Sequence, residues 1–393
     1  MRELNQLLAK GILKDPRIGP DSVDLVRLVL KSLNCRTTGK MSFRPIPGLP
    51  ERLEGPILFV IIDGLGMHLK EIWPEGGFFN TYFTTQLNSV FPSTTSCALC
   101  AVATGFWPAN FGITGWNTYL PNYQKSLALL PYVYQNSEEH FKEAALEEIL
   151  HLFSLLPLIP GGSAIISPDS TIAGVYSSWF CGGMPTYGYQ KETEIPALIK
   201  TAFTTGAQFI YLYLPMVDHV QHHWGLFTDE TARQIDLMDD LLTDIQASLA
   251  GKVTIIATAD HGQIEIPTER QYFWDENHIL KKMLSAPPSG EPAQPIFHVA
   301  SGQENKFKVR FDEYYGDDFL LIPSFDLLNA GFFGREGHLE EMKARLGTYT
   351  AVGKSEAAAI HYTETGQEKK SFKGYHGGLR PFEMDVPLFL VLK

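Results

Sequence analysis

Three short apolar runs, each followed closely by an aspartate, constrain the fold more than any other feature of this sequence. They are ILFVII (57–62) before Asp63, QFIYLYL (208–214) before Asp218, and VTIIATA (253–259) before Asp260. Apolar, β-branched runs of this length are typical of buried parallel strands. A stretch with apolar residues at helical spacing separates the last two runs, and the order strand, helix, strand predicts a parallel sheet with helices packed on its faces.

The aspartates lie where a parallel sheet binds its ligands. The carboxyl ends of parallel strands meet at one edge, and in open α/β sheets that edge forms the ligand crevice. A single aspartate there is explained by turn chemistry alone. Three of them, two with histidine nearby, predict a site that holds cations.

The segment VDHVQHHWG carries the clearest metal-ligand spacing. Asp218 and His222 are four residues apart, so on a helical turn they share a face and can reach one ion. Carboxylate plus imidazole suits zinc and tolerates manganese or iron. His219 and His223 are competing candidates, although the spacing favours His222. Taken alone, the segment fits a solvated, histidine-rich turn equally well.

Two further histidines stand in contexts where a ligand could be held. TADHGQ places Asp260 and His261 side by side at a strand end, where the following turn lets both converge on one ion. GYHGG places His376 between glycines, which allow the backbone to bend around a ligand. Each of these motifs alone is also explained by an ordinary structural turn.

The stretch FPSTTSCALCAVATG (91–105) predicts a turn, a run of hydroxyl side chains and then a small-residue helix that ends near Gly105. Ser93, Thr94 and Thr95 are good helix caps. A helix N-terminus also binds anions, and a hydroxyl held there beside a divalent cation can act as a nucleophile. The two roles are compatible in one residue. Together, three aspartates, three histidines and a hydroxyl predict a two-metal site for displacement at phosphorus.

Composition excludes several classes of protein. The 393 residues carry a net charge of −12, which argues against a nucleic-acid-binding surface. No apolar stretch approaches the ~20 residues of a spanning helix, and the charges spread through the N-terminus do not resemble a signal peptide. We therefore expect a soluble, cytoplasmic protein without a membrane partner. The four cysteines are too few for a disulfide framework, and Cys97 and Cys100 are expected to pack on one helix.

The motifs occur in the order found in one known family. VIIDGLG, FPSTTSCALCAVATG with FWPANFGITGW behind it, D-x-x-x-H-x-x-G, ADHGQ and GYHGG-x-x-P-x-EM-x-VPL run from about residue 57 to the C-terminus. In this the chain resembles the alkaline phosphatase superfamily, and within it the type I phosphodiesterase/nucleotide pyrophosphatase family. The resemblance implies an α/β fold with a central, mostly parallel sheet sandwiched by helices, with a small α+β insertion.

The resemblance also implies roles for particular residues. One divalent ion would be held by Asp218, His222 and His376, and a second by Asp63, Asp260, His261 and the nucleophile oxygen. Zinc is the first candidate, and manganese or iron are alternatives. The family's nucleophile precedes the glycine of the ATG-like turn by ten positions, which gives Thr95, with Thr94 as the fallback.

Two positions depart from the family pattern. Eukaryotic members carry an aromatic residue directly after the nucleophile, where this chain has Ser96. They carry an asparagine that binds phosphate where this chain has Trp116, with Asn117 one residue further on. The backbone N–H of Ser96 and the side chain of Asn117 are therefore the candidates for binding a phosphoryl oxygen, and a preference for nucleotides does not follow from the resemblance.

The expected division of the chain has three parts. These are an N-terminal helical extension (1–50), a catalytic domain (51–267 and 373–393) and a small α+β insertion that caps it (268–372). Within the insertion we expect a Pro-rich turn region at 286–295, strands at FHVA, KFKVRF and YTAVG, and a short helix at LEEMKARLG.

The predicted function is a metal-dependent phosphodiesterase or nucleotide pyrophosphatase that forms a phosphothreonine intermediate on a small phosphorylated substrate, with a nucleotide as one candidate. Alternatives are a phosphomonoesterase, a phosphonate hydrolase or a non-catalytic metal-binding homologue. From Val90 to Pro121 there is no Lys or Arg, which favours diesters over dianionic monoesters. Arg380 could supply the missing cation. The aromatic residues that could wall the second ester group, or could equally belong to the core, are Phe106, Trp107, Trp116 and Tyr119.

Overall fold

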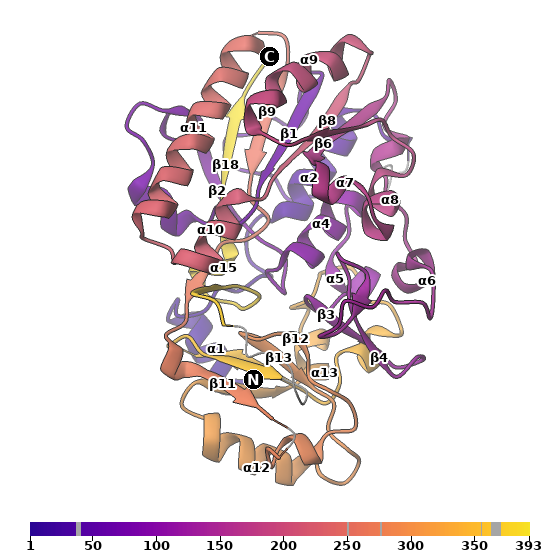
Figure 1. Cartoon of the computed structure of the whole chain (residues 1–393), viewed down its shortest axis with the longest axis vertical. Helices are drawn as coiled ribbons and strands as arrows, with labels where there is room; N and C mark the ends of the chain where they lie inside the picture. Colours follow the sequence, from indigo (N-terminus) through magenta and orange to yellow (C-terminus); the bar gives the residue numbers. More distant parts are fainter. Residues whose placement is uncertain (37–40, 250, 276, 355, 363–370) are drawn as a thin grey trace.

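A seven-stranded central sheet forms the larger half of the computed structural model (Figure 1). The structure describes residues 1–36, 41–249, 251–275, 277–354, 356–362 and 371–393. In spatial order the strands are β2 (Phe83–Asn88), β18 (Asp385–Val391), β9 (Thr254–Thr258), β1 (Ile57–Ile62), β8 (Phe209–Leu214), β6 (Ser163–Pro168) and β7 (Thr186–Tyr189). Only β18 runs antiparallel to its neighbours, so the sheet is mostly parallel.

The three runs predicted as parallel strands lie next to one another in the centre of this sheet. β1 pairs in parallel with β8 on one side and with β9 on the other, and all six residues of β1 are buried. Strands buried on both faces need apolar side chains throughout, which explains the continuous apolar runs. The expected fold class is confirmed, and the carboxyl ends of β1, β8 and β9 meet at one edge.

Helices flank this sheet and the second sheet described below (Figure 1). The longer ones are α1 (Arg2–Ala9), α2 (Ser22–Ser32), α4 (Thr95–Thr104), α8 (Val175–Cys181), α9 (Ile195–Thr204), α10 (Met216–Trp224), α11 (Asp229–Leu249) and α12 (Glu304–Tyr315). Short helices are α3 (Phe78–Tyr82), α5 (Pro108–Phe111), α6 (Leu146–Leu150), α7 (Asp169–Ile172), α13 (Ser324–Asn329), α14 (Met342–Arg345) and α15 (Pro381–Met384). In the part of the chain that the structure describes, no helix combines the length and apolar character needed to cross a membrane. The cytoplasmic location stays a prediction.

A second seven-stranded sheet lies below the first in Figure 1. Its strands, all antiparallel, are β14 (Phe319–Pro323), β15 (Tyr349–Gly353), β13 (Gln294–Phe297), β12 (Ser289–Glu291), β3 (Asn117–Leu120), β4 (Lys125–Ala128) and β5 (Val133–Tyr134). Two small ladders join β10 (Ile264–Glu265) to β17 (Gly374–Tyr375) and β11 (Gln271–Trp274) to β16 (Ala359–Tyr362). The second sheet also draws on 117–134, and the three-part division proposed above stays a prediction.

One segment of the expected insertion has a different secondary structure. KFKVRF was expected as a strand because its residues alternate, but it lies inside helix α12. The buried residues of α12 are Phe307, Phe311 and Tyr315, which repeat every four residues and pack into one apolar cluster. The four-residue spacing of these aromatic residues, which continues one turn beyond the alternating segment to Tyr315, indicates a helix.

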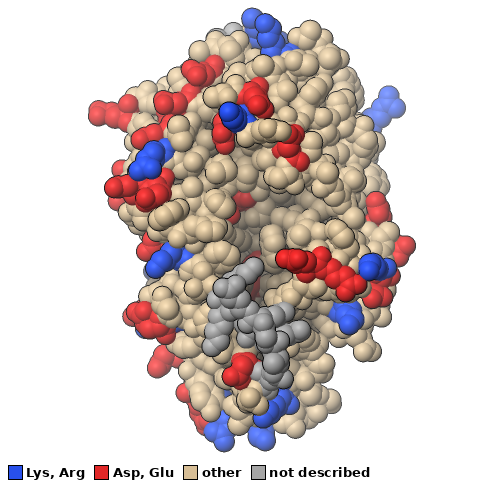
Figure 2. All heavy atoms as spheres, viewed as in Figure 1, with Lys and Arg blue, Asp and Glu red and all other residues tan. Residues whose placement is uncertain are grey.

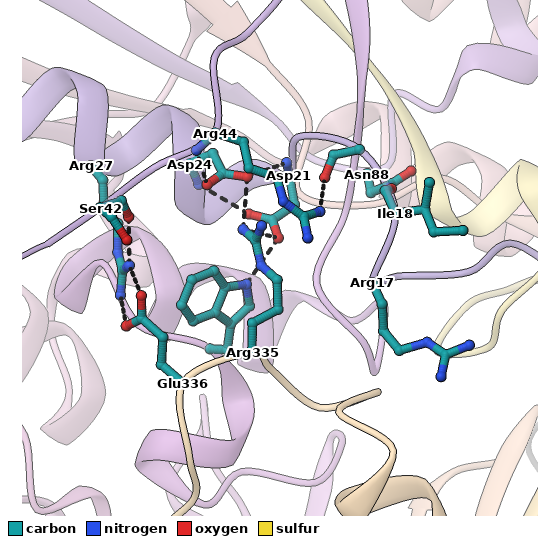
Figure 3. Close-up of polar contacts among 12 residues, drawn as sticks. Arg17, Ile18, Asp21, Asp24, Arg27, Ser42, Arg44, Asn88, Arg335 and Glu336 are labelled. Atoms are coloured by element: carbon teal, nitrogen blue, oxygen red, sulfur yellow. Dashed lines mark hydrogen bonds and ion pairs between the residues drawn. The ribbon is translucent and has the colours of Figure 1, made fainter.

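A buried polar network ties the N-terminal region to the loop at 335–336 (Figure 3). Arg335 donates to Asp21 at 3.0 Å and to Asp24 at 2.8 Å, and Trp107 Nε1 donates to Asp21 at 2.9 Å. Arg27 donates to the carbonyl oxygen of Gly105, the C-cap of α4, at 2.7 Å. The ion pairs of Arg335 therefore hold the 335–336 loop against the start of α2, and the hydrogen bond from Arg27 to Gly105 holds α2 against the end of α4.

Two arginines of this network also hold the same indole ring. The guanidinium carbons of Arg27 and Arg335 lie 4.3 and 4.5 Å from the centroid of the Trp107 ring. Arg27 completes its contacts with a two-point ion pair to Glu336, at 2.6 and 2.7 Å. Burial and the neighbouring Asp24 carboxylate raise the pKa of Asp21 to about 6, against the opposing effect of Arg335.

Candidate active site

The turn after β1 brings two of the aspartates together. The Asp218 N–H donates to the carbonyl oxygen of Asp63 at 2.9 Å, and Asp218 lies in the first turn of α10. Gly64 has a φ of +74°, and a Cβ on it would lie 2.7 Å from the Asp218 Cα. Only glycine permits both this backbone conformation and this close approach. Because glycine follows Asp63, helix α10 can begin beside Asp63.

We expect Gly64→Ala to lower kcat/KM by about 100-fold, because the new methyl group must displace Asp218, and a shift of about 1 Å in an active site has effects of this size. The matched control is Gly76→Ala. Gly76 has a nearly identical φ of +73°, but nothing lies within 4 Å of the position its Cβ would take. Steady-state kinetics of both variants test the prediction, and equal losses would show that backbone strain rather than the contact with Asp218 is responsible.

Asp218, His222 and His376 form one cluster of potential metal ligands, with one ligand atom from each lying within 4.8 Å of the others. His222 Nε2 is 3.3 Å and His376 Nε2 is 4.0 Å from the Asp218 carboxylate. The Nδ1 of His222 lies 2.8 Å from the Gly374 carbonyl oxygen, to which it donates. This bond fixes the ring and leaves Nε2 directed at the cluster, as is usual for a metal-binding histidine.

The two histidines of this cluster have pKa values shifted in opposite directions. Burial alone would lower the pKa of His222, but the Asp218 carboxylate outweighs burial and raises it to about 9. Burial, together with the neighbouring His261, lowers the pKa of His376 well below its usual value. His222 therefore favours its protonated form, and His376 favours its neutral form. A divalent ion would replace that proton and bind both neutral rings.

A second group of side chains meets around His261. Its other members are Asp63, Asp260 and Thr95. His261 Nε2 lies 3.5 Å from Asp63 Oδ1, 3.5 Å from Asp260 Oδ2 and 3.0 Å from Thr95 Oγ1. His261 Nδ1 lies 3.0 Å from the Gly262 carbonyl oxygen, so Nε2 is the nitrogen left for a ligand. Asp218 also belongs to a cluster with Asp63 and His261, and its carboxylate is thus within reach of both ligand sets.

These residues fit a divalent metal. Asp63 Oδ1 and Asp260 Oδ2 are buried without a hydrogen-bond partner among the described residues, which is costly for carboxylates unless a cation binds them. Burial, followed by the charges of Asp260 and Asp218, raises the pKa of Asp63 well above its usual range. The oxygen and imidazole donors are those that zinc and manganese bind.

The competing histidines lie outside both clusters. His219 and His223 stack on each other along α10, with ring centroids 4.4 Å apart, and His223 Nδ1 lies 2.8 Å from the His219 carbonyl oxygen. Among the described residues it is His222, four positions after Asp218, that joins the ligand cluster. Helical spacing was therefore the informative signal in this histidine-rich segment.

Thr95 is the first residue of α4, and Thr94 is its N-cap residue. The Thr95 hydroxyl faces His261, whereas the Thr94 hydroxyl is buried with no hydrogen-bond partner among the described residues. Ser96 donates its hydroxyl hydrogen to the Gly115 carbonyl oxygen at 3.0 Å, so its side chain is held away while the first-turn N–H groups remain at the helix end. Asn117 lines the same cavity as Thr95.

Three further residues support the clusters, and sequence reasoning missed them all. Tyr213 donates its hydroxyl hydrogen to the Asp63 carboxylate, and Gln263 donates to the carboxylate and the carbonyl oxygen of Asp218. Glu291 accepts from the Trp116 N–H at 2.6 Å, and burial raises the pKa of Glu291 to about 7. Tyr213 lies in an apolar strand and Glu291 in a Pro-rich stretch, so neither carried a sequence signal.

A cavity of about 1380 Å³ opens onto these clusters. In the view of Figure 2 the surface is hollowed between the two halves of the molecule, and the walls of the hollow are mostly uncharged. Among the described residues, the cavity is lined by no Lys or Arg. The acidic side chains that line it are those of Asp63, Asp218, Glu138 and Glu291.

Of the four aromatic residues that were candidates for either the cavity wall or the core, one lies in the described lining and three serve packing. Trp116 lines the cavity. Phe106 and Trp107 instead pack over the Arg27 guanidinium, and Tyr119 contacts His298 with ring centroids 4.3 Å apart. These rings serve packing. They follow the C-terminal end of the nucleophile helix, whereas Thr95 lies at its N-terminal end.

Arg380 does not serve as the missing cation. Its guanidinium donates to the Glu356 carbonyl oxygen at 2.7 Å and lies 3.8 Å from the Glu383 carboxylate. The side chain is buried and is not part of the described cavity lining. The expectation that it might fold in toward the substrate is therefore not met by this structure.

Comparisons with known proteins agree with this geometry. The family described as type I phosphodiesterase/nucleotide pyrophosphatase matches residues 59–328. No curated protein sequence matches the chain significantly. Human ectonucleotide pyrophosphatase/phosphodiesterase 5 superposes with a TM-score of 0.66 at 15% identity, over 86% of this chain and 87% of that one.

Two other solved structures have the same fold. An inactive threonine-to-alanine variant of the murine protein, in complex with AMP, gives a TM-score of 0.62 at 16% identity, covering 85% of this chain and 87% of that chain. Phosphonoacetate hydrolase from Sinorhizobium meliloti 1021, in complex with phosphonoformate, gives 0.57 at 16% identity, covering 88% and 90%. The chain thus belongs to the type I phosphodiesterase/nucleotide pyrophosphatase family, within the alkaline phosphatase superfamily, and has that superfamily's hydrolase fold.

Proposed function

We propose that the chain hydrolyses phosphodiesters, with Thr95 as the nucleophile and two divalent cations bound by the clusters described above. Asp218, His222 and His376 would hold one cation, and Asp63, Asp260, His261 and the Thr95 oxygen the other. The observation that carries the proposal is the position of the Thr95 hydroxyl, 3.0 Å from His261 Nε2 and at the start of α4. The inactive threonine variant of the murine relative is consistent with it.

The chain's own residues divide the reaction into two displacements. Thr95 Oγ1 loses its proton and attacks phosphorus, the bond to the leaving oxygen breaks, and a phosphothreonine ester forms while the leaving oxygen takes up a proton and departs as the first alcohol. Water then attacks the same phosphorus, which returns the Thr95 hydroxyl and releases a phosphomonoester. When bound, the divalent cations supply the positive charge that stabilises the attacking and leaving oxygens.

Binding of the phosphoryl group is assigned to the start of α4 and to β3. The N-terminal N–H groups of a helix, here including that of Ser96, attract an anion. Asn117, the first residue of β3, lines the cavity near Thr95 and can donate to a phosphoryl oxygen. Glu291 helps to position β3, because it accepts from the backbone N–H of the preceding Trp116.

We expect bis(4-nitrophenyl) phosphate to be hydrolysed with a higher kcat/KM than 4-nitrophenyl phosphate, by roughly 10-fold or more. A dianionic monoester needs an added cation or a dedicated arginine, and the described cavity lining contains neither Lys nor Arg. The comparison is made at one metal concentration and one pH. A preference for the monoester would favour the phosphomonoesterase alternative, and hydrolysis of neither would favour a non-catalytic homologue.

A further inference from the structure

The cavity extends well beyond the metal-ligand clusters. Its volume of about 1380 Å³ exceeds the ≈ 300–1,000 Å³ of typical small-molecule sites. Two segments that follow Thr95 in the sequence, 130–140 and 165–186, also line the cavity. They contribute no ligand to either cluster. A phosphate and a small alcohol would leave most of this space unfilled.

The wall formed by α8 and its surroundings is mainly apolar, with the hydroxyl side chains of Ser170, Thr171 and Ser177 among the lining residues. Its lining side chains include Ile172, Val175, Tyr176 and Phe180, and the opposite segment contributes Leu130, Pro131 and Val133. The Val175 side chain is 43% exposed even though it faces the cavity. Apolar surface that stays in contact with water is unfavourable, and contiguous patches of it commonly mark a binding site.

The charge of the cavity selects against polyanions. The described lining contains four acidic side chains and no basic one, and Asp260 adds a buried carboxylate behind them. The four positive charges of two divalent cations would balance Asp63, Asp218, Asp260 and one phosphodiester charge, and the described lining adds no basic side chain for further phosphates. A substrate with a single negative charge and a large neutral group matches this arrangement.

One polar group lies where such a substrate could carry an oxygen close to its phosphate. The Tyr211 ring contacts Phe180, with centroids 4.9 Å apart, and Tyr211 is two residues before Tyr213, whose hydroxyl reaches Asp63. The buried Tyr211 hydroxyl has no hydrogen-bond partner among the described residues. It can therefore donate to an ester or ether oxygen at the head of an otherwise apolar group.

We propose that the substrate is a phosphodiester with one charge and a long apolar ester group, which lies against α8 between 130–134 and 172–180. This inference rests on the proposed function, since it concerns the same site. A nucleotide would bring a polar base edge to a wall that is mainly apolar, and a nucleoside polyphosphate would bring charges for which the described lining has no basic partner.

The test is a series of n-alkyl 4-nitrophenyl phosphates with methyl, butyl and octyl groups, assayed below micelle-forming concentrations with the same added metal. Each methylene buried in an apolar cavity contributes up to about fourfold in affinity for the transition state. We expect kcat/KM to rise at least about 100-fold from methyl to octyl. The 4-nitrophenyl ester of thymidine 5′-phosphate, which has the same leaving group and a nucleoside in place of the alkyl chain, is assayed beside them.

Val175→Asp tests the location of the chain. A carboxylate on this wall should reduce the octyl-to-methyl ratio of kcat/KM at least about tenfold. Val309→Asp is the matched control, because Val309 is 57% exposed on α12, outside the described cavity lining, and the ratio should not change there.

The outcomes separate the two proposals. If the diesters are hydrolysed at equal rates whatever the chain length, or if the thymidine ester is preferred to the octyl ester, the apolar substrate is wrong and the phosphodiesterase stands. If no diester is hydrolysed, the proposed function itself fails. A strong chain-length effect that Val175→Asp leaves unchanged would overturn the assignment to the α8 wall.

Discussion

Replacing Thr95 with alanine is expected to reduce phosphodiester hydrolysis by roughly 10⁴-fold or more, since removing a nucleophile has effects of this order in other enzymes. The hydroxyl lies 3.0 Å from His261 Nε2 at the start of α4. Kinetics with bis(4-nitrophenyl) phosphate measure the loss, and mass spectrometry of acid-quenched enzyme should locate the phosphoryl group on Thr95 in the parent protein.

Thr94→Ala is the control for this experiment. Thr94 is the N-cap residue of α4 but makes no side-chain capping bond, so its removal should cost at most about 1 kcal/mol of stability and leave turnover largely intact. Thr95→Ser, which keeps a hydroxyl, should recover part of the activity. Near-normal turnover in Thr95→Ala together with loss in Thr94→Ala would move the nucleophile by one residue.

The number of divalent ions bound per chain should also depend strongly on single ligand residues. We expect two divalent ions per chain, measured by elemental analysis, and His376→Ala should remove one of them because His376 belongs to one ligand cluster only. Asp218→Asn should affect both, because the Asp218 carboxylate lies within reach of both clusters. Either loss should lower activity by orders of magnitude, since the bound ions provide the charge stabilisation.

His219→Ala is the matched histidine variant for the metal measurement. His219 lies one residue after Asp218 on the same helix but outside both clusters, so metal content should remain at the parent value. One ion or none in active parent protein would contradict the two-metal mechanism. Equal occupancy in the His376→Ala and parent proteins would remove His376 from the ligand set.

The central sheet and the clustering of its aspartates could be predicted from sequence for a simple geometric reason. Strands buried on both faces must be apolar throughout, so β1, β8 and β9 are visible as continuous runs. Residues that follow parallel strands then meet at one edge whatever their separation along the chain. For this reason Asp63 and Asp260 lie close together. The Asp260 carboxylate accepts a hydrogen bond from the N–H of Gly64, the residue after Asp63, although 196 positions separate Gly64 from Asp260.

The part of the cavity away from the ligand clusters could not be predicted in this way, because the lining segments 130–140 and 165–186 carried no motif that the sequence analysis used. Glu291 lies in a stretch that was expected to be a Pro-rich turn but forms the β12–β13 hairpin, with Gly290 paired to Pro295. The rings of Phe106 and Trp107 follow the nucleophile helix in sequence, yet the helix carries its C-terminal end away from the site. Proximity to a catalytic residue along the chain is a poor guide when a helix of ten residues intervenes.

The contacts around Trp107 have a consequence for how this protein would be subdivided. The family match begins at residue 59, after α2, whereas Arg27 of α2 holds the carbonyl oxygen of Gly105 and thus the far end of the nucleophile helix. The family match therefore begins later in the chain than the part that holds the nucleophile helix in place. A chain that lacks only the residues before 59 would retain every candidate ligand and the nucleophile, and would lose the hydrogen bond from Arg27 that holds the C-terminal end of α4.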